Sequence, residues 1–125
     1  MFVINEDKSI YLTRGDVANI SVSANTSNGS PHTFKSGDVV RFKIFKRKAC
    51  DEVLLVKDVE VTQETTEVAV RLEKADTKIG EIINKPMNYW YEVELNPDTE
   101  PQTIIGYDEE GEKIFRLYPE GSDVT

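Results

Sequence analysis

The stretch that decides the fold is Tyr89–Leu95, with the sequence YWYEVEL. Its two tyrosines, its valine and its leucine recur at every second position, and Trp90, Glu92 and Glu94 stand between them. Successive side chains of a strand point to opposite faces, so this alternation predicts a strand with one face on a core and the other toward water or a partner. We therefore expect Trp90, Glu92 and Glu94 to share the outward face, and we treat them as candidate partner-binding residues because exposed aromatic side chains anchor interfaces.

Two further strand-like runs follow this stretch, at Gln102–Gly106 and Lys113–Tyr118. The segments that separate the three runs, Asn96–Thr99 and Asp108–Gly111, are rich in the residues that form turns. The C-terminal third of the chain is therefore predicted to be a three-stranded meander.

The rest of the chain shows the same pattern of short alternating runs separated by turn residues. Such runs occupy residues 9–12, 18–24, 39–44, 53–61 and 67–72. A bulge is expected around Lys57 and Asp58, and residues 73–79 lack alternation and could form one helical turn. About eight short strands, each with one apolar face, predict a single all-β domain over residues 1–125. A β-sandwich covers such faces most simply, and a barrel is the alternative.

A partial internal repeat accompanies these strands. The segment Leu12–Val22 matches Phe34–Ile44 in residue type at each position, with Gly-Asp-Val at the same place in both. Glycine supplies a positive φ in a turn, and aspartate can bond nearby backbone amides as the next strand begins. We expect two similar turns, and we interpret Arg14-Gly15-Asp16 as one of them, although the same tripeptide is an integrin ligand.

Composition narrows the function. The chain has 125 residues and a net charge of −8, which repels nucleic acid. No apolar run approaches the roughly 20 residues of a membrane span, and acidic residues appear within the first seven positions, so we expect neither a membrane segment nor a signal peptide. A single cysteine excludes an internal disulfide and favours an intracellular protein or part of a particle.

No catalytic set is apparent in the sequence. His32 is the only histidine and is interpreted as a solvated loop residue, and Cys50 is interpreted as a bystander thiol on a hairpin tip. Without a second soft ligand or a relay partner, neither a zinc site nor a catalytic triad can be assembled. Glu92 and Glu94 could form a glycosidase pair, but 23 acidic residues make that spacing expected by chance. We therefore expect no enzyme activity, no cofactor and no metal.

The order of motifs resembles a known family. Arg14-Gly15-Asp16-Val17, Gly37–Ile44, Tyr91–Leu95, Gln102–Gly106 and Ile114–Leu117 follow one another as in the N-terminal Ig-like domains of upper baseplate proteins from tailed phages of Gram-positive bacteria and related small prophage proteins. The segment Glu81–Met87 is longer than the short glycine turn expected there. The resemblance covers nearly the whole chain.

The resemblance implies an Ig-like antiparallel β-sandwich and a non-enzymatic role. Such a domain would be a virion component made in the cytoplasm of the bacterial host. It would dock onto other tail or baseplate proteins or onto copies of itself. The alternative, suggested by Trp90 together with Tyr89, Tyr91, Tyr107 and Tyr118, is a carbohydrate-binding β-sandwich that uses exposed aromatic rings.

Overall fold

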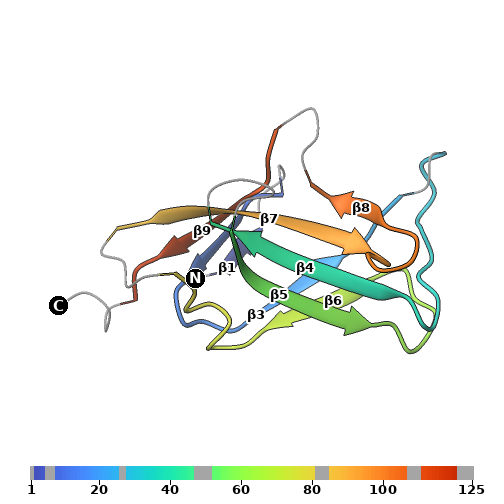
Figure 1. Ribbon diagram of the computed structural model, residues 1–125, viewed down its shortest axis with the longest axis horizontal. Coiled ribbons are helices and arrows are strands. Elements are labelled where there is room, and N and C mark those ends of the chain that lie inside the picture. Colours follow the sequence, from blue (N-terminus) through green and yellow to red (C-terminus); the bar gives the residue numbers. More distant parts are fainter. Residues whose placement is uncertain are drawn as a thin grey trace.

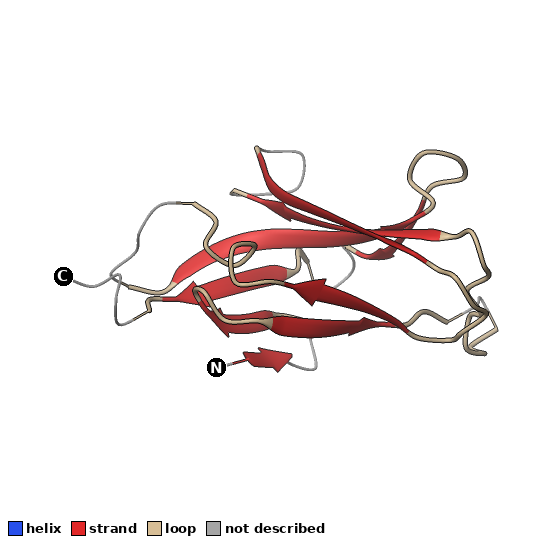
Figure 2. Cartoon of the chain, turned by 90° about the horizontal axis from the view of Figure 1, so that it is seen from below, coloured by secondary structure: helices blue, strands red, loops and turns tan. Residues whose placement is uncertain are grey.

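The computed structural model describes residues 2–4, 8–25, 28–46, 52–80, 85–106 and 111–120. The regular structure of these residues is entirely β-strand, drawn in red in Figure 2. The strands are β1 (Phe2–Ile4), β2 (Ile10–Thr13), β3 (Ala18–Val22), β4 (Val39–Phe45), β5 (Val53–Glu60), β6 (Val68–Leu72), β7 (Met87–Leu95), β8 (Gln102–Ile105) and β9 (Ile114–Tyr118). The predicted all-β class is confirmed.

The strands form two sheets of unequal size. The larger sheet has the order β1-β2-β9-β7-β4-β5, with β8 also paired to β7, and the smaller sheet contains β3 and β6. Figure 1 shows β3 running behind β4 and β5. Strands β4, β7 and β9 in one sheet and β3 and β6 in the other follow the C-F-G and B-E arrangement of an Ig-type sandwich.

The core lies between the sheets and is built by the alternation observed in the sequence. On β7, Tyr89, Tyr91, Val93 and Leu95 are buried, whereas the residues between them are half-exposed. Phe42 is fully buried at the centre of the core. Its ring stacks on the Tyr91 ring with centroids 5.4 Å apart and meets the Phe115 ring edge-on with centroids 6.2 Å apart. The small sheet contributes alternate residues of β3 and β6 to the same core.

The predicted C-terminal meander is wrong in its last step. Strand β8 pairs with Val93–Leu95, but β9 pairs with Met87–Trp90 and not with β8. Strand β7 is nine residues long, which is enough for two short strands to lie end to end along one of its edges. An antiparallel sandwich was expected, but the pairing of β2 with β9 is parallel, so the large sheet is mixed.

Two smaller expectations are tested by the structure, and one strand was not expected. The bulge lies on β5 at Leu54, opposite Ile44 and Phe45, and not at Lys57 and Asp58, which pair regularly with β4. Strand β1 was not predicted, because three residues are too few to show alternation. Residues 74–77 form a turn closed by hydrogen bonds from Asp76 and Thr77 to the Glu73 carbonyl. Cys50, Tyr107 and the acidic residues 108–110 lie outside the described residues.

The internal repeat is confirmed as a repeated turn. Gly15 and Gly37 have φ values of +90° and +96°. The next residue bonds backward in the same way in both turns: the Asp16 N–H donates to the Thr13 carbonyl and the Asp38 N–H donates to the Lys35 carbonyl, each at 3.0 Å.

The Arg14-Gly15-Asp16 tripeptide is part of the first of these turns. The Arg14 side chain is only 6% exposed, and its guanidinium donates to the Lys78 carbonyl at 3.2 Å. The tripeptide therefore holds the turn against the connector after β6, and its arginine is not displayed to a receptor.

Candidate interaction face

The outer face of the large sheet carries the three residues singled out from the sequence. Trp90, Glu92 and Glu94 lie on β7, each half-exposed, on the side opposite the buried tyrosines. Their common placement follows from the period-two alternation of the strand. The structure thus brings the three side chains together on one face, and their role in binding a partner stays a prediction.

Trp90 is part of an apolar row that crosses four strands. The strand registers pair Val53 of β5 with Phe45 of β4, Phe45 with Trp90, and Trp90 with Ile114 of β9. Directly opposed side chains in a sheet lie close enough to touch. We call these four residues the apolar row.

Exposure varies along the apolar row. Val53 is 45% exposed, Trp90 and Ile114 are half-exposed, and Phe45 is only 6% exposed although it lies outside the main core cluster. Phe45 is therefore covered on the outer face and not by the sandwich interior. The row is an apolar strip with a buried aromatic ring near its centre.

Sequence reasoning found only one member of this row. The predicted strand ends at Ile44, because Phe45 is an apolar residue at a position that the alternation assigns to the outer, polar face. In the structure β4 stays in regular register with β7 through Phe45, and the extra residue of the register shift is Leu54 on β5. The available signal was the alternation itself, because one more step of it places Phe45 on the outer face beside Arg41 and Lys43.

A charged zone lies beside the apolar row. Lys43 is opposite Glu92 in the strand register, and its ammonium lies 2.7 Å from the Glu94 carboxylate. Burial and the neighbouring Glu94 together raise the pKa of Glu92 above its usual range. The opposite charges of Lys43 and Glu94 cancel, so the carboxylate of Glu92 is the remaining charge in this zone.

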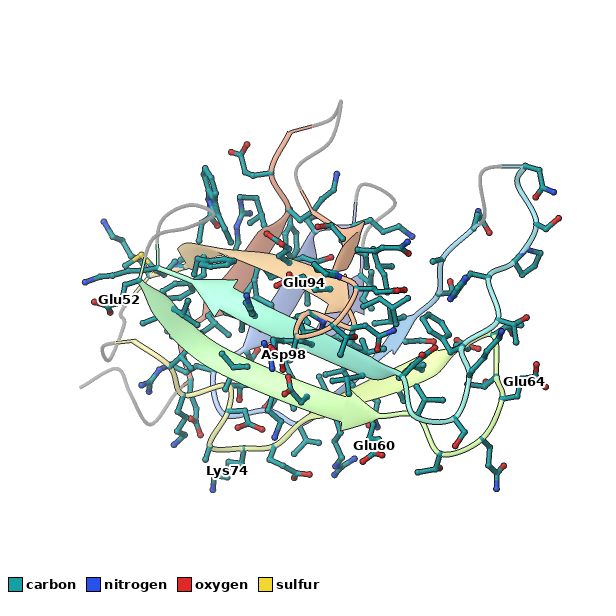
Figure 3. All side chains as sticks on the ribbon, turned by 45° about the vertical axis from the view of Figure 1, so that its right-hand side comes forward. Glu52, Glu60, Glu64, Lys74, Glu94 and Asp98 are labelled. Atoms are coloured by element: carbon teal, nitrogen blue, oxygen red, sulfur yellow. The ribbon has the colours of Figure 1, made fainter. Side chains whose placement is uncertain are left out.

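A second ion cluster closes the far end of the face. The Arg41 guanidinium donates to both oxygens of Asp58, at 2.8 and 3.0 Å, and to Asp98 at 3.1 Å. These hydrogen bonds raise the pKa of Arg41, and the Arg41 bond to Asp58 lowers the pKa of that carboxyl. Figure 3 labels Glu94 on β7 and Asp98 in the turn that follows it. A bidentate pair such as Arg41–Asp58 fixes the geometry of this end of the face.

The opposite end of the face carries two further aromatic rings. The Arg116 guanidinium lies 4.8 Å from the centre of the Tyr11 ring, and its Nε donates to the Asn88 side chain at 2.6 Å. Tyr11 and Tyr118 meet edge-on, with centroids 6.0 Å apart and planes inclined at 67°. These two rings therefore do not form a flat platform.

Comparisons with known proteins add nothing to this geometry. No protein family, no curated protein and no solved structure matched the chain. Within the described part of the chain, no group of three or more His, Cys, Asp and Glu side chains is placed to hold a metal ion. None of the described segments is a helix long and apolar enough to cross a membrane.

Proposed function

We propose that this protein is a non-enzymatic structural module of a phage or prophage tail or baseplate, acting through protein–protein contacts made by the outer face of its large sheet. The observation that carries the proposal is the apolar row Val53–Phe45–Trp90–Ile114, which crosses four strands in register. Its partner is another tail or baseplate protein or a second copy of the chain.

The physical character of the face supports a protein contact. Interfaces have an apolar centre with an aromatic anchor and a polar rim. Here Trp90 supplies the anchor, and the pairs Lys43–Glu94 and Arg41–Asp58 supply a rim whose charges are already satisfied within the protein. A partner can then cover the apolar row without having to neutralise most of the neighbouring charges.

The assignment to a phage particle rests on the resemblance described above. The Gly-Asp turns at Gly15 and Gly37 and the Tyr91–Leu95 strand follow the order of the phage baseplate domains. The protein would accordingly be made in the bacterial cytoplasm and incorporated into the virion. Detection of the protein in purified particles from an induced lysogen, by mass spectrometry, tests this part separately. Its absence from particles that carry complete tails would contradict it.

Trp90 provides a direct test of the contact face, because it is the only tryptophan. We expect the protein to form a complex, with itself or with a tail protein, in which the Trp90 emission maximum shifts to shorter wavelength as the ring leaves water. Light scattering gives the mass of the complex, and emission is recorded during dilution. Trp90→Ala should weaken the complex at least tenfold, as expected for an aromatic anchor whose loss costs about 2 kcal/mol.

Phe2→Ala is the matched control for that variant. Phe2 is an exposed aromatic residue on β1 at the edge of the sheet, 38% exposed and away from the apolar row. The control should leave the complex intact. If Trp90→Ala folds normally and associates as strongly as the wild type, Trp90 is not the anchor and the proposed face is wrong.

The alternative function is carbohydrate binding through exposed aromatic rings. Trp90, Tyr11 and Tyr118 on the outer face favour it, but Tyr89 and Tyr91 are buried in the core. A glycan array probed with the wild type and with Trp90→Ala tests it. Loss of all signal in the variant would support the alternative, and an array without hits would remove it.

A further inference from the structure

A polar cleft lies at the end of the sandwich formed by β8 and the segment that follows β3. Figure 1 shows this end of the chain at the right. Its volume is about 640 Å³. Protein sites for small ligands occupy roughly 300–1,000 Å³. The cleft is therefore large enough for one sugar ring or one to two amino-acid residues, and it is separate from the apolar row.

The cleft combines an apolar floor with unused hydrogen-bonding groups. Leu95, Ile104 and Ile105 form the floor. The side chains of Asn25 and Gln102 line it from two different segments and make no hydrogen bond to any other described residue. A few convergent polar groups over an apolar floor are the usual composition of a binding site.

The described residues that line the cleft include one positive charge, although the protein as a whole is acidic. Lys8 is the one lysine, arginine, aspartate or glutamate among the residues that line the cleft in the described structure. The chain as a whole has a net charge of −8. Lys8 is therefore the described lining residue that can pair with an anionic group, whereas Asp38 and Glu100 line the adjoining hollow that shares His32, Leu95 and Gln102.

The structure holds Lys8 and His32 at the rim of this cleft. Lys8 has a φ of +71°, and its carbonyl accepts a hydrogen bond from the Tyr91 hydroxyl. The backbone N–H of His32 donates to the Ala24 carbonyl at 2.8 Å. The imidazole ring packs edge-on against the Phe34 ring, with centroids 4.9 Å apart. His32 is therefore a half-buried, positioned residue and not a solvated loop histidine as the sequence suggested. Its Nε2 is buried and has no hydrogen-bond partner among the described residues.

We propose that this cleft binds a ligand that carries a carboxylate next to hydrogen-bonding groups, with Lys8 as the counter-charge and Asn25 and Gln102 as the groups that orient it. Two sources supply this chemistry: a hexuronic acid unit of a saccharide, or an aspartate in an extended peptide. The proposal does not depend on the outer face or on the phage assignment.

The single histidine makes the test direct, because the ring protons of His32 give isolated signals in a proton NMR spectrum. The probes are glucuronate and N-acetyl-aspartate amide, each titrated to 20 mM at pH 7.5. Their neutral counterparts, glucose and N-acetyl-asparagine amide, serve as ligand controls. We expect at least one carboxylate probe to shift the His32 signals in a saturable way while its neutral counterpart does not.

Two variants connect the effect to the cleft, and a third is their control. Lys8→Gln should weaken binding of the active probe about tenfold, as loss of one charge-assisted hydrogen bond does. Gln102→Ala, at an exposed position, should weaken binding without changing the preference for the carboxylate. Lys74→Gln removes the same charge as Lys8→Gln from an exposed turn outside the cleft and should leave binding unchanged (Figure 3).

Each outcome decides part of the proposal. Binding of glucuronate alone assigns the site to an acidic saccharide, and binding of the aspartate probe alone assigns it to a peptide. Equal binding of charged and neutral probes, an unchanged affinity in Lys8→Gln, or no movement of the His32 signals with any probe would overturn it.

Discussion

Gly80 provides the sharpest test of the packing, because both its backbone and its surroundings exclude a side chain. Its φ is +70°, and a Cβ there would overlap the Tyr89 hydroxyl oxygen and lie 3.2 Å from Tyr89 Cζ. Tyr89 is 5% exposed, so the ring has little room to move. Gly37 has a similar φ of +96°, but the position that a Cβ would take there is open space. Gly37→Ala is therefore the matched control for Gly80→Ala.

The expected costs can be worked out from these two environments. The left-handed conformation costs an alanine about 1–2 kcal/mol, and the lower entropy of the unfolded chain returns about 0.4–1 kcal/mol at either site. Gly37→Ala should then lower the free energy of unfolding by about 1 kcal/mol. Gly80→Ala adds overpacking against a buried ring, about 1–3 kcal/mol, for a total of about 2–4 kcal/mol.

Urea denaturation of the two variants, followed by circular dichroism, measures the difference. A double-mutant cycle with Tyr89→Phe isolates its cause, because removal of the hydroxyl oxygen should recover about 1 kcal/mol or more in the double variant relative to additivity. Equal costs for Gly37→Ala and Gly80→Ala, or additive effects in the cycle, would refute the packing argument.

Two further predictions concern pH. Glu92→Gln should be more stable than the wild type at pH 7, because burial and Glu94 raise the pKa of Glu92 and make its charged form unfavourable in the folded protein. That advantage should disappear as the pH falls below the raised pKa and the wild type also becomes neutral, and an advantage that persists at pH 2.5 in chemical denaturation would contradict it. Asp38→Ala should cost about 1 kcal/mol at pH 7, because the carboxylate accepts the Lys35 N–H at 2.9 Å and thereby has a lowered pKa. The charged form of Asp38 stabilises the fold, whereas the charged form of Glu92 destabilises it. The cost of Asp38→Ala should therefore vanish as the pH falls through the lowered pKa of Asp38. Thermal unfolding of the variant and the wild type at pH 7 and at pH 2 measures this change.

Local alternation in the sequence predicted the strands and their buried faces well. The inward side chains of β3, β6 and β7 follow the period-two pattern, because each of these strands has one face on the core and one toward water. The two Gly-Asp turns were predictable for a similar reason, since glycine at a positive φ is a local requirement. The outward placement of Trp90 follows from the same alternation.

Contacts between distant segments were not predictable in this way. The pairing of β2 with β9 joins residues about a hundred positions apart, and no local pattern marks either strand as a parallel partner. The cleft at the end of the sandwich is formed by Lys8, Asn25, His32 and Gln102, which come from four places in the chain. Phe45 was missed because it is an apolar residue at an outward position, where the alternation of β4 otherwise places Arg41 and Lys43.

The parallel pairing of β2 with β9 also has a consequence for how the chain is synthesised. Strand β2 and the first half of β7 gain their common neighbour only when Ile114–Tyr118 has left the ribosome. Until then both strands present open edges, which are sites for pairing with other chains. Because this closure joins residues far apart in sequence, it is slow relative to local turns. Ribosome-bound chains that stop before β9 should therefore be the forms that engage chaperones, and release of the last described strand should end that dependence.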